Sequence, residues 1–69
     1  LPFAIVPFED RDAREAGLIR AELTRIGRPI GPFDTLIAGQ ARARGWTIVT
    51  RNVSEFSRVP GLTIENWED

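Results

Sequence analysis

Two carboxylates, a hydroxyl and an amide are the side chains of this sequence whose types and placement could do chemistry together. Asp34 stands near the start of "RPIGPFDTLIAGQARARG", and Thr50, Asn52 and Glu55 end or follow the apolar segment "WTIVT". Oxygen ligands of this kind suit hard cations such as Mg²⁺ and Mn²⁺. The chain contains no histidine and no cysteine, which excludes serine–histidine triads, imidazole or thiolate metal ligands, and disulfides. Chemistry must therefore come from carboxylates, amides, hydroxyls and arginines.

Asp34 is expected at the head of an apolar helix face. Asp34, Ile37, Ala38 and Ala41 are spaced at i, i+3, i+4 and i+7, which places them on one side of a helix. A charged side chain that faces the core from the start of a helix needs a cation or a metal as a partner. The structural alternative is helix capping, because an acid in the first turn complements the helix dipole. The sequence leaves both interpretations of Asp34 open.

The second group of candidates stands at the end of a predicted strand, where parallel α/β sheets bind ligands. The structural alternative for Asn52 and Glu55 is a capping box, since the spacing N-x-x-E is typical of a helix start. The functional interpretation is that oxygen ligands from this loop face Asp34. We therefore predict that Asp34 and Glu55 approach each other at the end of the 46–50 strand. Two or three such ligands are too few to complete a cation site, so more carboxylates would come from residues outside this chain.

Arginines and tryptophans complete the set of candidates. All nine basic residues are arginines, and the formal net charge is −1. Arginine binds phosphate oxygens well, and solvated surface is the structural alternative. The candidate phosphate contacts are Arg28, Arg42, Arg44 and Arg51. The rings of Trp46 and Trp67 could stack on bases, with packing beside a strand as the alternative.

The elements that must position these side chains follow from periodicity and turn residues. Strands that alternate with helices predict an α/β fold with parallel pairing. A stripe of apolar residues from Ala16 to Ile26 supports the first helix, Gly27 is its predicted C-cap, and a close contact with another backbone would explain Gly17 inside it. The predicted elements are a strand at 3–8, helices at 9–27 and 32–44, a strand buried on both faces at 46–50, a loop and short helix at 51–59, and an edge strand at 62–67.

The length of 69 residues allows one small domain at most. A chain of about 60 residues buries only ~60% of its unfolded surface. No apolar run approaches the roughly 18 residues of a membrane span, so we expect no membrane partner. The absence of cysteine fits the cytoplasm, which is the expected location. The sequence starts abruptly in strand-like residues, and we expect part of the protein to lie upstream.

The segment "IGPFDTLIAGQARARGWTIVTRNVSEFSRVPGLTIENW" resembles the C-terminal half of a PIN-domain ribonuclease toxin of the VapC type, from type II toxin–antitoxin systems. The shared pattern is I-G-P-x-D-x-L-I-A, a helix ending in glycine, a strand ending V-T-x-N-x-x-E-F, then V-P-G-L and an acidic-aromatic end. The resemblance implies a three-layer α/β/α fold with a mostly parallel sheet. Residues 1–69 would be the C-terminal portion of one such domain, without the N-terminal strand and helices that carry an aspartate and a glutamate.

The resemblance also implies a function and assigns roles to residues. It implies a metal-dependent endoribonuclease that cleaves RNA, such as tRNA, through acids that hold Mg²⁺ or Mn²⁺. Asp34 and Glu55 match the family acids and would be catalytic. Asn52, where many relatives carry aspartate, would be a third metal ligand, and Thr50 would support the cluster. The candidate RNA contacts are Arg28 and Arg51.

The expected partners are a cognate antitoxin, the RNA substrate, a second copy in a homodimer, and the missing N-terminal segment, on a separate chain or lost by cleavage or disorder. The alternative function is a catalytically dead, truncated toxin that serves as a dimerisation or antitoxin-binding module. A third interpretation, a small nucleotide-binding fragment, lacks a glycine-rich phosphate loop. We expect that residues 1–69 do not fold as an independent, active monomer, because the 46–50 strand has too few neighbours.

Overall fold

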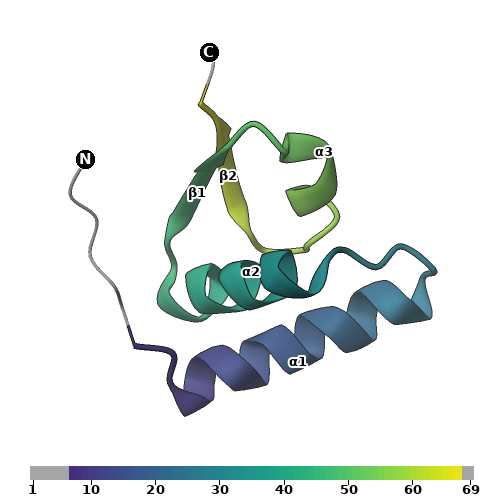
Figure 1. The fold of residues 1–69 in the computed structure, drawn as a ribbon, viewed down its shortest axis with the longest axis vertical. Coiled ribbons are helices and arrows are strands. Elements are labelled where there is room, and N and C mark those ends of the chain that lie inside the picture. Colours follow the sequence, from purple (N-terminus) through teal and green to yellow (C-terminus); the bar gives the residue numbers. More distant parts are fainter. Residues whose placement is uncertain (1–6, 68–69) are drawn as a thin grey trace.

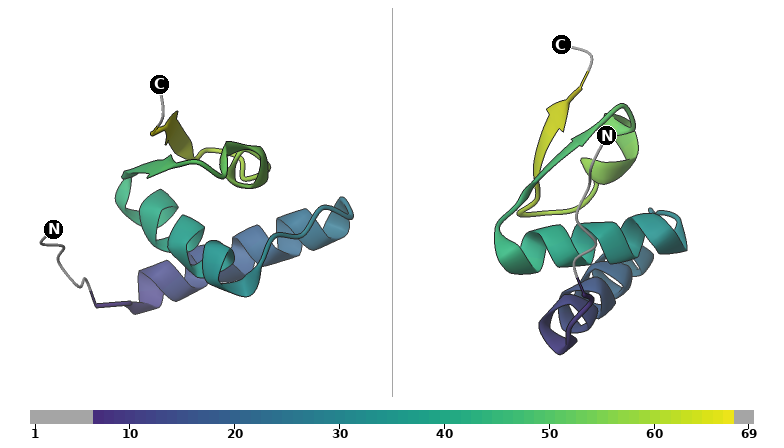
Figure 2. Two further views of the ribbon diagram at one scale, coloured as in Figure 1. Left: turned by 45° about the horizontal axis from the view of Figure 1, so that its top comes forward. Right: turned by 60° about the vertical axis from the view of Figure 1, so that its left-hand side comes forward.

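A computed structural model describes residues 7–67 of the chain. Its elements are α1 (Asp10–Arg25), α2 (Pro32–Arg44), β1 (Thr47–Thr50), α3 (Val53–Phe56) and β2 (Thr63–Asn66). Figure 1 shows α2 between α1 and the pair of strands, and both views in Figure 2 keep this order. The structure is therefore a mixed α/β arrangement in which α2 connects the outer helix to the sheet.

The predicted elements agree with the structure except at a few ends. The helix predicted at 32–44 is confirmed at both ends, and the helix predicted at 9–27 is confirmed with a shorter range. The C-cap of α1 is Ile26 rather than Gly27, which follows it with a left-handed φ of 71°. The strand predicted at 3–8 lies mostly outside the described residues, and positions 7 and 8 are not in a strand.

The ends of α2 decide where β1 begins. Gly31 is the N-cap and Pro32 opens the helix, a place where the missing proline N–H is not needed. Gly45 ends the helix with a left-handed φ of 69°, and the Trp46 N–H donates to the Ala41 carbonyl oxygen at 2.8 Å. This turn reverses the chain, so β1 runs back along α2. The end of β1 therefore lies toward the start of α2.

The two strands pair in parallel, in a register that runs from Thr47 opposite Thr63 to Thr50 opposite Asn66. The edge strand predicted at 62–67 is found at Thr63–Asn66, where Ile64 is half-buried and its neighbours are exposed. The prediction that the 46–50 strand is buried on both faces is wrong, since Val49 is 61% exposed. Burial of a strand depends on what covers each face, and the elements within residues 7–67 cover only the face of Ile48.

Gly39 sets the distance between α1 and α2. A Cβ added at Gly39 would lie 2.7 Å from the Cα, Cβ and N atoms of Ala16, so only glycine allows this approach. A Cβ added at Gly17 would meet no atom within 4 Å. The close contact expected at Gly17 is thus not found among the described residues, and the glycine that does make one is Gly39.

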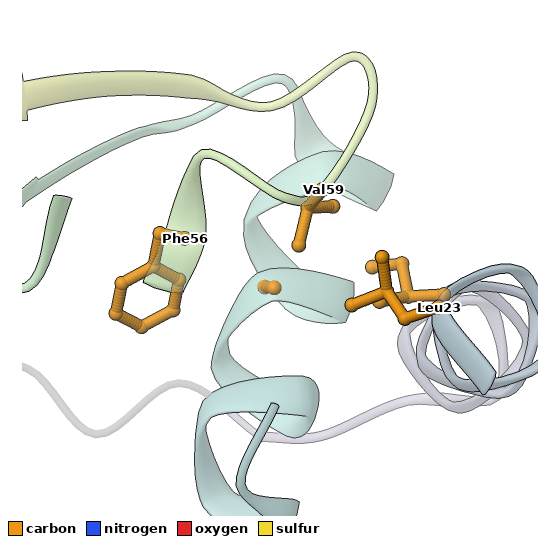
Figure 3. Close-up of a cluster of buried hydrophobic side chains, with 5 residues drawn as sticks. Leu23, Phe56 and Val59 are labelled. Carbon is orange, nitrogen blue, oxygen red and sulfur yellow. The ribbon is translucent and has the colours of Figure 1, made fainter. Parts of the chain in front are cut away.

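The core is small and draws on three helices and the loop after α3. Its buried residues are Ile19, Leu23, Ala38, Phe56 and Val59. Figure 3 shows Phe56 at one end of this cluster, Leu23 of α1 at the other, and Val59 between them. The prediction that Ile37 shares the buried side of α2 is wrong, because α1 packs on the neighbouring face and leaves Ile37 50% exposed. Within residues 7–67, no helix is long and apolar enough to cross a membrane.

Candidate functional site

The structure brings Asp34 and Glu55 together, as predicted from their positions in the sequence. Asp34 lies in the first turn of α2, and Glu55 lies in α3, just beyond the end of β1. Their carboxyl groups lie close enough for each to shift the pKa of the other. A Cβ added at Gly31 would lie 3.8 Å from Glu55 Oε1 and 3.9 Å from Asp34 Oδ2, so both carboxylates face the start of α2. We call Asp34 and Glu55 the acid pair.

Glu55 is held by groups from both sides of the site. The Gly31 N–H donates to Glu55 Oε1 at 3.0 Å, and the Asn52 side-chain amide donates to Glu55 Oε2 at 3.1 Å. Gly31 is the N-cap of α2, so Glu55 fills the place at this helix start that a capping side chain would take. The partial positive charge of a helix N-terminus also favours an anion there.

The capping box that the sequence offers for Asn52 and Glu55 is wrong, because the α3 cap has no side-chain capping hydrogen bond. The alternative for Asp34 is compatible with the structure, since Asp34 is an acid in the first turn of α2. The Asn52 N–H, which a capping box would direct to Glu55, donates instead to Thr50 Oγ1 at 3.0 Å. One oxygen of Glu55 therefore binds the start of α2, while the other binds the side chain of Asn52 rather than its backbone N–H.

The pKa values of the two carboxyl groups in the acid pair are shifted in opposite directions. The Gly31 N–H, together with Asp34 and Asn52, lowers the pKa of Glu55 to about 2. The hydrogen bond with Glu55, burial, and repulsion between the two charges raise the pKa of Asp34. Glu55 is therefore the stable anion of the pair, and Asp34 binds a proton first. A bound cation would relieve the same repulsion that a proton relieves.

The donor set fits part of a divalent-cation site. The acid pair and Asn52 offer carboxylate and amide oxygens, which are the ligands that Mg²⁺ and Mn²⁺ prefer. Within residues 7–67, however, no group of three or more acidic, histidine or cysteine side chains could hold a metal ion. Thr50 binds the backbone of Asn52 and so orders the loop that carries it. The described residues therefore provide one side of such a site.

The two predicted RNA contacts, Arg28 and Arg51, are both exposed. Arg51 follows β1 directly, and its guanidinium lies 4.6 Å from the centre of the Trp67 ring. The backbone N–H of Trp67 donates to the Thr50 carbonyl oxygen at 3.3 Å, which fixes the backbone of Trp67 beside the end of β1. Arg51 thus stands beside the loop that carries Asn52. Arg28 lies in the loop between α1 and α2, three positions before Gly31.

Sequence reasoning missed a buried ion pair. Asp12 is 0% exposed, and its carboxylate accepts hydrogen bonds from Arg44 Nε at 3.0 Å and Nη2 at 2.7 Å. This two-point pairing holds the pKa of Asp12 well below its usual range. The signal was available, because Asp12 continues the buried stripe of Ala16, Ile19 and Leu23 at helical spacing.

Arg42 and Arg44 are not the solvated surface residues or free phosphate contacts considered from the sequence. Arg42 donates to Glu15 at 2.7 Å, to Glu22 at 3.0 Å and to the Pro60 carbonyl oxygen at 3.1 Å. Arg44 also lies 5.1 Å from the centre of the Trp46 ring. Their function within the described residues is to bind α2 to α1 and to the loop before β2.

Comparison with known proteins gives the family. Residues 1–62 match the family model described as the PIN domain. The chain is 54% identical over 63 residues to the tRNA(fMet)-specific endonuclease VapC of Shigella flexneri, covering 91% of this chain and 48% of that protein. It is 42% identical over 64 residues to ribonuclease VapC2 of Rickettsia felis, covering 93% of this chain and 48% of that protein.

Solved structures give the same answer for the fold. The DNA-bound VapBC of Salmonella typhimurium matches with a TM-score of 0.86 at 48% identity, covering 90% of this chain and 47% of that chain. VapBC2 of Rickettsia felis bound to a promoter DNA fragment matches with a TM-score of 0.86 at 42% identity. The chain spans about half the length of the relatives that it matches. It belongs to the PIN-domain family and is related to the VapC ribonucleases of that family.

Proposed function

We propose that this chain contributes one side of the active site of a metal-dependent endoribonuclease toxin. The observation that carries the proposal is the acid pair: α2 and α3 bring Asp34 and Glu55 together and give them opposite pKa shifts. Two carboxylates that compete for one proton form a natural place for a divalent cation. Relatives named as ribonucleases and as a tRNA-specific endonuclease support RNA, with tRNA as the proposed substrate.

The proposed function gives separate roles to the metal ligands and to the RNA contacts of this chain. Asp34 and Glu55 would hold Mg²⁺ or Mn²⁺ directly, with Asn52 as a third oxygen ligand. Such an ion supplies an activated water and stabilises charge on the scissile phosphate. The Gly31 N–H holds Glu55 Oε1 at the start of α2, so that this ligand is oriented toward Asp34. The hydroxyl of Thr50 supports Asn52, and Arg28 and Arg51 would bind RNA phosphates beside the acid pair.

The partners follow from the same relationship. We propose a cognate antitoxin as the protein partner, on the support of the VapBC complexes whose structures match this chain. A second copy of the chain and the rest of a PIN domain would complete the assembly, in the cytoplasm. The 69 residues alone would be inactive, because a hard cation binds about six oxygen ligands and this chain offers two or three.

A second candidate function is a catalytically inactive module for dimerisation or antitoxin binding. The observation that favours it is the number of large apolar side chains that are exposed within residues 7–67, among them Phe33, Ile37 and Val49. Exposed apolar side chains mark an interaction site where they form one contiguous patch. Cation binding separates the two candidates, because a docking module has no need of a functional acid pair.

Mn²⁺ binding by the purified 69-residue chain tests the proposal. Calorimetric titration at pH 7 is expected to show weak binding, and Asp34→Asn is expected to lower the affinity about tenfold or more. The matched control is Glu65→Gln, which removes an exposed carboxylate from β2. Equal binding by Asp34→Asn and the wild type would leave the docking module as the better function.

A further inference from the structure

The segment that carries α3 is attached to the loop before α2 at two points. Glu55 accepts a hydrogen bond from the Gly31 N–H at 3.0 Å. Three residues later, Arg58 Nη1 donates to the Pro29 carbonyl oxygen at 3.0 Å. The two bonds have opposite polarity and join residues that are two positions apart in the loop. We call these two bonds the loop clamp.

α3 needs external support because it contains only four residues. A helix of that length is not stable on its own in water. Phe56 and Val59 enter the core and fix the apolar side of the segment (Figure 3). Glu55 and Arg58, each one position earlier, fix the polar side through the loop clamp. The position of the Glu55 carboxylate therefore depends on both sets of contacts.

Arg58 acts on Glu55 through its charge as well. Burying the Arg58 side chain also costs free energy. Its positive charge contributes to the lowered pKa of Glu55. Its Nε atom is buried and has no hydrogen-bond partner among the described residues, which is an unfavourable state for a polar group. A hydrocarbon side chain would avoid that cost, but it would supply neither the bond to Pro29 nor the charge.

We propose that Arg58 is a positioning residue of the acid pair. By binding the Pro29 carbonyl, it keeps the Gly31 N–H within reach of Glu55 and so holds the Glu55 carboxylate beside Asp34. This inference rests on the proposed function, in which the acid pair binds a divalent cation. Arg58 itself would not touch the cation or the RNA.

The direct test measures the clamp in the 69-residue chain by NMR. The variants are Arg58→Gln and Arg58→Lys, and the control is Arg14→Gln, which removes an exposed arginine from α1. In Arg58→Gln, we expect exchange of the Gly31 amide hydrogen to accelerate about tenfold or more, because its bond to Glu55 is no longer held in place. Wild-type exchange at Gly31 in a folded Arg58→Gln variant would overturn the inference.

Arg58→Lys keeps the charge and can still donate to the Pro29 carbonyl oxygen, so we expect only several-fold faster exchange at Gly31. This variant decides the question if Arg58→Gln does not fold. Wild-type exchange in Arg58→Lys beside an unfolded Arg58→Gln would assign Arg58 to stability alone and would also overturn the inference.

The Mn²⁺ affinity of Arg58→Gln gives a second readout, because a charge effect and a positioning effect change that affinity in opposite directions. If Arg58 acted only through its charge, Arg58→Gln would bind Mn²⁺ more tightly, because a positive charge near the site is removed. The positioning role predicts weaker binding, since Glu55 is no longer held beside Asp34; tighter binding would contradict it. A wild type whose Mn²⁺ affinity is unchanged by Asp34→Asn would refute the proposed function, while the exchange of the Gly31 amide hydrogen would still decide the role of Arg58.

Discussion

Replacement of Gly39 by alanine tests whether the contact between α1 and α2 is as tight as the structure indicates. The new methyl group would lie 2.7 Å from three atoms of Ala16, two of which belong to the backbone. It would have to withdraw by about 0.7 Å to reach 3.4 Å, where ordinary contact begins. A backbone cannot rotate out of the way, so the two helices must separate.

The expected magnitude is the difference of two effects. Overpacking of this kind costs about 1–3 kcal/mol, and we expect the upper part of that range because the clash involves backbone atoms. Alanine also gains about 1 kcal/mol over glycine inside a helix. Gly39→Ala should therefore lower the free energy of unfolding by about 1–2 kcal/mol. Gly17→Ala, where the added methyl group meets nothing within 4 Å, should raise it by about 1 kcal/mol.

Urea unfolding followed by circular dichroism measures both variants at one fixed protein concentration, since association would change the apparent stability. The two substitutions make the same chemical change in neighbouring helices, so each is the control for the other. Stabilisation by both, or equal destabilisation, would refute the packing argument. Gly39→Ala should also weaken Mn²⁺ binding, because moving α2 moves Asp34 relative to Glu55.

Two further predictions concern the ion pair and the exposed apolar surface. Asp12→Asn should lower the free energy of unfolding at pH 7 more than Glu65→Gln does, because it breaks a buried pair with Arg44; equal losses in urea titrations would contradict this. The pairing with Arg44 lowers the pKa of Asp12, so the ion pair stabilises the fold above pH 3.8, the pKa of the unfolded state, and this stabilisation is lost as the pH falls below that value. The difference in unfolding free energy between Asp12→Asn and the wild type should therefore become small in acid. The 69-residue chain should sediment as an oligomer, because Phe33 and Val49 are exposed; a monomer with a cooperative melt would contradict that expectation.

The parts of the structure that local chemistry decides could be predicted from the sequence. Proline after Gly31 and the glycine at 45 mark the ends of α2, and both ends are found as expected. The meeting of Asp34 and Glu55 could also be predicted, because a helix followed by a tight turn and a strand brings the start of one to the end of the other. The catalytic and metal-binding roles of these residues stay predictions.

The parts that depend on distant neighbours could not be predicted. Val49 and Ile37 have the sequence pattern of buried residues, but burial requires a second surface, which residues 7–67 do not supply at these positions. The partner of Glu55 is a backbone N–H that lies 24 positions away, and backbone donors leave no mark in the pattern of side chains. Asp12 resembled an ordinary acid at a helix start, and only its place on the buried stripe distinguished it.

The tight turn at Gly45 has a consequence for how this segment can change in length. Because the hydrogen bond from the Trp46 backbone N–H to the Ala41 carbonyl oxygen fixes the turn, the length of α2 sets the distance between the start of β1 and Asp34. One residue inserted within α2 would rotate Asp34 by about 100° and shift it by about 1.5 Å, which takes its carboxylate away from Glu55. A residue inserted between Gly61 and Leu62 would lengthen a loop and leave both acids in place. Insertions and deletions should therefore accumulate at the second position and be eliminated at the first.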